Sequence, residues 1–225
     1  LAGFLTRMGA KIKGAGSSVI VIDGVKRLNA VEYTIMPDRI VAQTYLISAL
    51  ITGGEVLLKN AIPSHINSGI AILNEMGAKI HINDNDIYLK SCDKIKNIHI
   101  IKTMPYPGFP TDAQAVFTAM ATVAQGTTVI VENIFESRLK HIPELVRMGA
   151  KIRTEGRVAV VEGVERLYGA DVFSPDLRGG AALVVAGLCA NGETVVKNTC
   201  FIDRGYEDLE NNLCMLNADI YRKVK

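Results

Sequence analysis

The pentapeptide Met76-Gly77-Ala78-Lys79-Ile80 occurs three times in this chain, with near-identical copies at Met8-Gly9-Ala10-Lys11-Ile12 and Met148-Gly149-Ala150-Lys151-Ile152. A fourth, diverged copy reads Leu216-Asn217-Ala218-Asp219-Ile220. Successive copies are separated by 68, 72 and 68 residues. This spacing is longer than the repeat of common solenoids, so each repeat is expected to be a folding unit of several helices and strands.

Each repeat shows the same order of predicted elements. A helix ends at the Met-Gly pair, short strands follow, and a second helix begins shortly after a proline. The second helices are predicted over residues 38–50, 112–123 and 176–190, each followed by a strand. Because these helices are apolar on almost all sides, they are expected to lie inside a domain. The predicted fold is an α/β inside-out barrel, with three units about a pseudo-threefold axis, buried helices and outer sheets.

Further details of the repeats are predicted from their capping residues and their ends. Ser64 is expected to cap the helix that follows Pro63, and Gly77 to end that helix in a left-handed conformation. The last copy is expected to stop at Lys225 after one strand, and a segment upstream in a parent chain is expected to complete the final sheet. Because Leu1 begins inside a helical pattern, the chain is interpreted as an excised piece.

The composition argues against several classes of function. The 225 residues carry a net charge of only +2, from 25 basic and 23 acidic residues, so no surface for nucleic acid or an anionic membrane is expected. No apolar stretch is long enough for a membrane span and no signal peptide opens the chain, so a soluble, cytoplasmic protein is predicted. The four cysteines lack CxxC spacing, which indicates reduced structural thiols without a metal site.

An aspartate lies at the start of each second helix, after a proline. For Asp38 and Asp176 the simple interpretation is an N-cap that accepts hydrogen bonds from free amides of the first turn. Asp112 is ambiguous, because Thr111 is an alternative cap and a rigid loop over residues 106–111 precedes it. A carboxylate held there could bind or deprotonate a hydroxyl. Both interpretations of Asp112 stay open on the local sequence.

Three arginines lie at equivalent edges of the repeated units: Arg138, Arg178 and Arg204. A single arginine is usually a solvated or ion-paired surface group, and Arg204 has carboxylates close by in the sequence at Asp203 and Glu207. Guanidiniums that converge, however, bind carboxylate or phosphate through paired hydrogen bonds. The repeated placement therefore predicts an anionic ligand.

Other catalytic patterns are missing from the sequence. It has no Ser-His-Asp order, no Walker loop and no GxGxxG motif, and no cofactor is predicted. His65 and His141 precede or open helices and are expected to cap or pack.

Five segments together resemble the enolpyruvyltransferase family, and the resemblance runs over essentially the whole chain. They are Met36-Pro37-Asp38-Arg39-Ile40, Gly108-Phe109-Pro110-Thr111-Asp112-Ala113-Gln114-Ala115, Phe135-Glu136-Ser137-Arg138, Pro175-Asp176-Leu177-Arg178-Gly179 and Ile202-Asp203-Arg204-Gly205-Tyr206-Glu207. That family has two domains, each an inside-out α/β barrel of three units, with the active site between them. The resemblance implies that residues 1–30 are the tail of the first domain and residues 31–225 most of the second.

The resemblance also implies a reaction and roles for individual residues. The closest pattern is that of members that transfer enolpyruvyl from phosphoenolpyruvate to the 3-hydroxyl of UDP-N-acetylglucosamine in peptidoglycan synthesis. Asp112 matches the aspartate that contacts the sugar hydroxyl and is the candidate base, and Ile134 matches a position whose backbone touches the sugar nucleotide. Arg204 matches an arginine that binds phosphoenolpyruvate, with Arg138 and Arg178 as supporting anion ligands. Asp38 and Asp176 match polar residues that line the cleft.

One departure from the family pattern is large. The family's general-acid cysteine, its catalytic lysine and another anion-binding arginine belong to the first domain, and none of the four cysteines here matches that cysteine. This chain alone is therefore expected to be inactive. Two alternatives remain: a fragment of a 5-enolpyruvylshikimate-3-phosphate synthase, and a binding module that keeps the fold without the chemistry.

Overall fold

A computed structural model describes residues 1–223, which form two compact units, Leu1–Met36 and the remainder from Pro37 onward. The first unit contains helix α1 (Ala2–Arg7) and the antiparallel strands β1 (Lys11–Lys13) and β2 (Val21–Asp23). No residue of this unit is fully buried, and its packing includes an edge-to-face pair of the Phe4 and Tyr33 rings, whose centroids lie 5.3 Å apart. The assignment of residues 1–30 and 31–225 to two domains of a parent protein stays a prediction.

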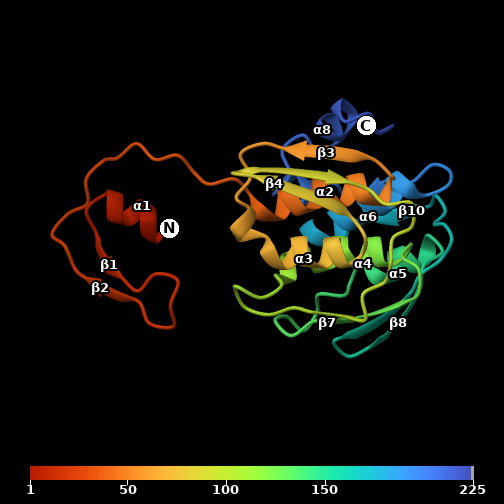
Figure 1. The fold of residues 1–225 in the computed structure, drawn as a ribbon, viewed down its shortest axis with the longest axis horizontal. Coiled ribbons are helices and arrows are strands. Elements are labelled where there is room, and N and C mark those ends of the chain that lie inside the picture. Colours follow the sequence, from red (N-terminus) through yellow and green to blue (C-terminus); the bar gives the residue numbers. More distant parts are fainter. Residues whose placement is uncertain (224–225) are drawn as a thin grey trace. The chain divides into compact units, whose positions relative to one another are not determined.

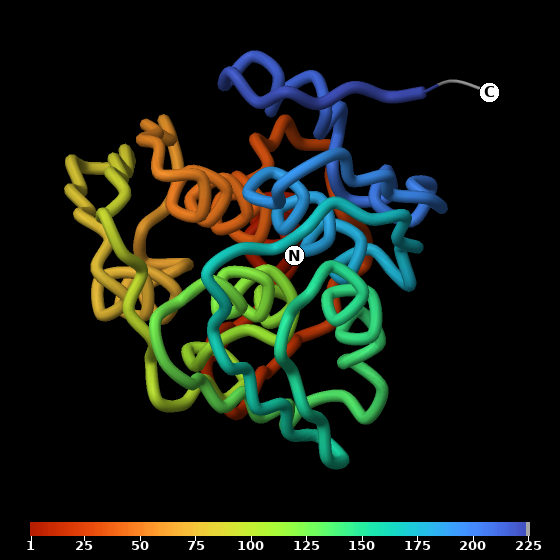
Figure 2. The backbone as a smooth tube through the Cα atoms, turned by 90° about the vertical axis from the view of Figure 1, so that its right-hand side faces the viewer, coloured from red at the N-terminus to blue at the C-terminus, as the bar shows by residue number. Residues whose placement is uncertain are grey.

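Three helices form the centre of the second unit: α2 (Arg39–Ile51), α4 (Thr111–Ala121) and α6 (Leu177–Cys189). Each of the three packs against the other two, and all their residues are buried or partly buried. Figure 1 shows them between the outer strands, and Figure 2 shows the same helices end-on near the middle of the unit. This arrangement confirms the predicted α/β fold with helices inside and sheets outside. Among residues 1–223, no helix has the length and apolar character needed to cross a membrane.

Two sheets cover this centre and follow the same plan. In the first, β3 (Glu55–Leu58) and β4 (Lys79–Asn83) both pair antiparallel with β5 (Asp86–Lys90). The second has the order β6-β7-β9-β8 and contains β6 (Ile100–Lys102), β7 (Thr127–Val131), β8 (Lys151–Glu155) and β9 (Val158–Glu162). Strands β6 and β7 are parallel, because α4 connects them as a crossover, and the remaining pairs are antiparallel.

The third sheet is smaller and corrects one prediction. Strands β10 (Asp171–Phe173) and β11 (Val195–Lys197) are parallel and joined by α6. Helices α7 (Cys200–Asp203) and α8 (Leu209–Met215) follow. The strand predicted after Asn217 does not form over residues 218–223, because no described strand lies beside this segment to supply ladder hydrogen bonds, and residues 224–225 lie outside the described part of the chain.

The turn after each repeated helix has a left-handed backbone. The glycines of the three close copies have φ values of +102° (Gly9), +104° (Gly77) and +92° (Gly149), and Asn217 takes the same conformation at +68°. Glycine adopts this region without a steric penalty and asparagine tolerates it better than most residues. The structure therefore confirms both the predicted Gly77 cap and the fourth, diverged copy.

The predicted Ser64 cap is wrong. Residues Pro63–His65 form a single 3-10 turn (η1), and helix α3 (Asn67–Glu75) begins after Ile66, without a side-chain cap. The His65 and Ile66 amides donate to the carbonyls of Ile62 and Pro63, so the tight turn itself satisfies them. This turn allows Ile66, only 2% exposed, to enter the core.

We expect Gly149→Ala to lower the free energy of unfolding by about 1–2 kcal/mol, because an alanine is strained at this positive φ. The new methyl group would also lie 3.2 Å from the Tyr168 ring. Urea denaturation measures the change. Gly54→Ala is the matched control, since its new methyl would meet only ordinary contacts of 3.6 Å or more outside the left-handed region. Equal effects of the two substitutions would contradict this explanation.

Candidate functional site

The first turns of the central helices lie at one end of the second unit. Two of them begin as predicted: Asp38 accepts hydrogen bonds from the Ile40 and Val41 amides at 2.7 and 3.1 Å, and Asp176 from the Arg178 and Gly179 amides at 3.0 and 2.8 Å. Both carboxylates are thus N-caps. Their further role in lining a cleft stays a prediction.

Helix α4 begins differently. Pro110 is its N-cap residue, and neither Thr111 nor Asp112 makes a capping hydrogen bond. The Asp112 carboxylate instead binds two guanidiniums: Oδ1 pairs with Arg138, and Oδ2 lies 3.4 Å from Nη2 of Arg178. The cap interpretation of Asp112 is therefore wrong in this structure, and its carboxylate belongs to a charged cluster of Asp112, Arg138 and Arg178, called the DRR cluster below.

Aromatic rings hold both arginines of the DRR cluster in place. The Arg138 guanidinium lies 5.5 Å from the centre of the Phe135 ring, and that of Arg178 lies 6.0 Å from the Tyr206 ring. Such contacts add electrostatic attraction to packing. Tyr206 is itself fixed, because its hydroxyl is 2.8 Å from the Thr44 hydroxyl of α2. Burial raises the pKa of Tyr206, so the ring stays neutral beneath Arg178.

Arg204 lies in a segment next to the DRR cluster. It follows α7 and is exposed, and the carboxylate of Asp203 pairs with Arg222 instead. No described carboxylate pairs with Arg204. The adjacent Gly205 is packed so closely on Leu177 that an added methyl would lie 2.9 Å from that side chain. The segment around Arg204 therefore packs on the start of α6, which carries Arg178. The role of Arg204 in an anion site stays a prediction.

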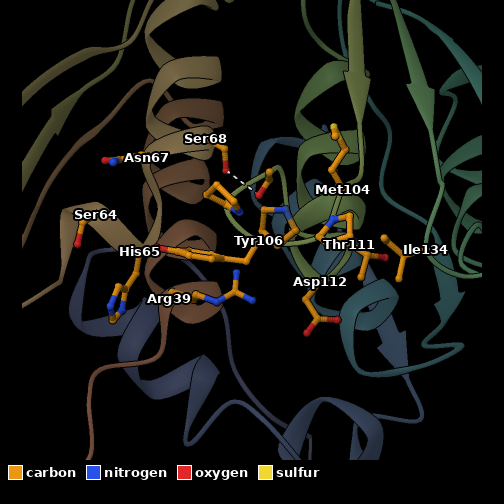
Figure 3. Close-up of a pocket in the computed structure, with 14 residues that line it drawn as sticks. Arg39, Ser64, His65, Asn67, Ser68, Met104, Tyr106, Thr111, Asp112 and Ile134 are labelled. Carbon is orange, nitrogen blue, oxygen red and sulfur yellow. Dashed lines mark hydrogen bonds between the residues drawn. The ribbon is translucent and has the colours of Figure 1, made fainter. Parts of the chain in front are cut away.

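Asp112 and Ile134 also line a cavity of about 400 Å³ (Figure 3). Arg39, His65 and Tyr106 lie on its opposite walls, and the Ser68 hydroxyl donates to the Gly108 carbonyl across 3.4 Å. The cavity thus has a carboxylate on one side and a cation on another. No role was predicted for Arg39 from the sequence, although its position after the capping Asp38 parallels that of Arg178 shortly after Asp176.

A second residue that sequence analysis missed is Glu132, which is 1% exposed at the end of β7. Its Oε1 accepts hydrogen bonds from the Thr103 hydroxyl (2.9 Å) and the amides of Ile134 (2.8 Å) and Phe135 (3.1 Å). Its Oε2 accepts one from the Thr111 hydroxyl at 2.8 Å. One buried carboxylate thereby fixes the loop that leads to Arg138 and the residue before Asp112. An acidic residue directly after a β-branched strand was the signal that could have revealed it.

His141 is fully buried close to Arg138 and the start of α6. Neither ring nitrogen has a hydrogen-bond partner in the described part of the chain. Burial lowers the pKa of His141 from 6.5 to about 4, although the nearby Asp176 carboxylate opposes this shift. The imidazole is therefore neutral at pH 7. This agrees with the prediction that His141 packs.

The cysteines are free thiols in the structure. Burial raises the pKa of Cys189 to about 11, which makes it a poor nucleophile at neutral pH. Among the described residues, no group of three or more histidine, cysteine or acidic side chains is placed to hold a metal ion.

Comparison with known proteins identifies the family. The sequence profile described as EPSP synthase (3-phosphoshikimate 1-carboxyvinyltransferase) matches residues 1–213. A protein of Desulfofundulus thermocisternus named UDP-N-acetylglucosamine 1-carboxyvinyltransferase is 52% identical over 223 residues, which are 99% of this chain and 91% of that protein. The chain belongs to the EPSP synthase family of enolpyruvyl transferases.

Other members of this enolpyruvyl transferase family are longer. UDP-N-acetylglucosamine 1-carboxyvinyltransferase 1 of Caldanaerobacter subterraneus subsp. tengcongensis is 52% identical over 99% of this chain but only 54% of its own length. The chain therefore spans about half the length of several relatives it matches. The enolpyruvyl transferase NikO from Streptomyces tendae has 26% identity and a TM-score of 0.86, over 98% of this chain and 53% of NikO. EPSP synthase from Acinetobacter baumannii, 21% identical with a TM-score of 0.73, shares the fold.

We expect Glu132→Gln to lower the free energy of unfolding by about 2–3 kcal/mol, because an amide nitrogen would replace one of two buried acceptor oxygens. Glu136→Gln is the matched control, since the Glu136 side chain is 85% exposed in its ion pair with Arg157. That control should cost less than about 1 kcal/mol. Urea denaturation of both variants compares them, and similar small losses would contradict the role of Glu132.

We also expect stability to fall as the pH is lowered from about 6.5 to about 4. The unfolded chain binds a proton on His141 in this range and the folded chain does not, so protonation favours unfolding, by about 3 kcal/mol in total. Urea midpoints at several pH values measure this. His141→Phe should flatten the slope, whereas His99→Phe, at an exposed position, should keep it. An unchanged slope in His141→Phe would exclude His141 as the cause.

Proposed function

We propose that this chain contributes one wall of the active site of a UDP-N-acetylglucosamine 1-carboxyvinyltransferase, which moves enolpyruvyl from phosphoenolpyruvate to the sugar 3-hydroxyl. The observation that carries the proposal is the DRR cluster of one carboxylate and two guanidiniums, whose Asp112 lines the cavity. The printed names of the relatives support this choice of acceptor. The reaction belongs to peptidoglycan synthesis, and so to cell shape and division, in the cytoplasm.

In this proposal Asp112 is the base. It takes the proton of the sugar hydroxyl as the oxygen bonds to C2 of phosphoenolpyruvate, while a proton is delivered to C3. The C2–O bond to phosphate then breaks and C3 loses a proton, which leaves the enol ether and inorganic phosphate. Arg138 and Arg178 stabilise the negative charge of the carboxylate or phosphate during both steps. By the family resemblance, the proton donor for C3 belongs to the other domain.

The remaining predicted residues have supporting roles. Arg204 is exposed beside the start of α6, where it is available to bind phosphoenolpyruvate. Ile134 lies in the cavity wall and contributes backbone contacts to the sugar nucleotide. Asp38 and Asp176 hold the helix starts that carry Arg39 and Arg178, and through these caps they shape the cleft. Arg39, on the opposite wall, supplies a cation for the anionic part of the acceptor.

The alternatives differ in ligand. A fragment of an EPSP synthase would bind shikimate 3-phosphate in this cavity, and a module without chemistry would bind neither reactant at Asp112. The buried Glu132 network argues against the module, because it organises polar side chains around Asp112 that packing alone does not require.

We expect UDP-N-acetylglucosamine to shift the NMR signals of the Thr111, Asp112 and Ile134 amides of this chain, and shikimate 3-phosphate to leave them unchanged. With inorganic phosphate present in place of phosphoenolpyruvate, Asp112→Asn should weaken sugar-nucleotide binding about tenfold, because a hydrogen bond to a charged acceptor contributes about 1.5 kcal/mol or more. Asp93→Asn, in an exposed loop outside the cavity, is the control and should bind like the parent. Shifts with shikimate 3-phosphate alone would favour EPSP synthase instead.

The chain by itself is expected to release no phosphate from phosphoenolpyruvate and UDP-N-acetylglucosamine, since the proton donor and part of the anion site are assigned to another domain. A coupled phosphate assay against a whole relative measures this. Turnover near that of the whole relative would contradict the shared site.

A further inference from the structure

The DRR cluster has more positive than negative charge. One carboxylate faces two guanidiniums, so the three side chains together have a net charge of +1. Both arginines are largely buried, with side chains that are 20% exposed for Arg138 and 14% for Arg178. Water therefore screens this charge only partly. The cluster can accept one further negative charge.

Two donors of the cluster also lack acceptors. Nε of Arg138 and Nη1 of Arg178 are buried, and neither finds a hydrogen-bond partner in residues 1–223. A buried donor without an acceptor is costly, and a guanidinium is best satisfied by an oxyanion that accepts two parallel hydrogen bonds. Asp112 therefore satisfies the two arginines only in part.

Asp112 can leave the arginines without disturbing them. Its side chain is 38% exposed at the cavity rim, whereas its backbone belongs to α4 and its neighbour Thr111 is tied to Glu132. The contacts of the arginines with the Phe135 and Tyr206 rings do not involve the Asp112 carboxylate. Rotation of one side chain is thus enough to empty a preformed oxyanion site.

We propose that Asp112 is an internal competitor for the oxyanion site of Arg138 and Arg178. Without ligand, its carboxylate occupies that site. An incoming carboxylate or phosphate displaces it, satisfies the two free donors and leaves Asp112 available to the acceptor hydroxyl in the cavity. Oxyanion binding would thereby make the Asp112 carboxylate available as the base. This inference rests on the proposed function, because it explains how one residue serves both reactants.

The test is a titration of the chain with inorganic phosphate, followed by the NMR signals of the arginine Nε–H groups. Asp112→Asn removes the competing charge and keeps the shape of the side chain, so it should bind phosphate about tenfold more tightly than the parent. Adding Arg138→Ala to that variant should abolish the gain. Asp84→Asn is the control for net charge, because Asp84 lies in an exposed turn at φ +51°, which asparagine also tolerates.

Asp112→Asn binding that is no tighter than that of Asp84→Asn would overturn the internal-competitor role. A second measurement uses the parent protein alone: saturating phosphate should move the carboxyl carbon signal of Asp112, and a signal that stays fixed would also refute displacement. The proposed function can fail separately. If Asp112→Asn tightens phosphate binding while UDP-N-acetylglucosamine does not bind at Ile134, the internal-competitor role of Asp112 is supported and the assignment of UDP-N-acetylglucosamine as acceptor is refuted.

Discussion

The burial of three apolar helices against one another is the constraint on which the rest of this structure depends. Helices α2, α4 and α6 have no exposed residue along their length, so water must be excluded from all their sides. Each is enclosed by its two partners and by the sheets around them (Figure 2). The helix starts cannot be buried in the same way, because their free amides need acceptors. The helix starts therefore lie together at a polar end of the second unit, and the candidate site is at this end.

The first turns of the three helices differ in their hydrogen-bond partners, and the candidate site lies where they differ. Asp38 and Asp176 each cap their own helix through one carboxylate oxygen. At α4 the corresponding hydroxyl of Thr111 binds Glu132, and the carboxylate of Asp112 reaches the arginines of two other segments. A repeated unit has thus kept its helix and changed the partners of its first turn. The repeated helices form the scaffold, and the charged cluster forms at the one helix start, that of α4, whose side-chain partners differ from the other two.

Glu132 connects the scaffold to the cluster. It is a buried charge with four donors, which is an arrangement that holds its neighbours in one geometry because any movement would leave a charged oxygen unsatisfied. The loop after β7 and the start of α4 are both attached to it. The positions of Arg138 and Asp112 relative to each other are therefore set by packing and hydrogen bonds that do not include either side chain. The Asp112 carboxylate takes no part in the Glu132 network.

The amino-acid sequence by itself determined the repeat, the order of most elements, the left-handed turn at Gly77, and the caps at Asp38 and Asp176. These features are local or periodic, and each residue type favours them through its own backbone or side-chain chemistry. Only the tertiary structure decided the partners of Asp112, the importance of Glu132 and Arg39, the 3-10 turn before α3 and the missing strand after Asn217. Those features depend on which distant segments lie side by side. A hydrogen bond or a strand pair forms only where folding brings both partners together.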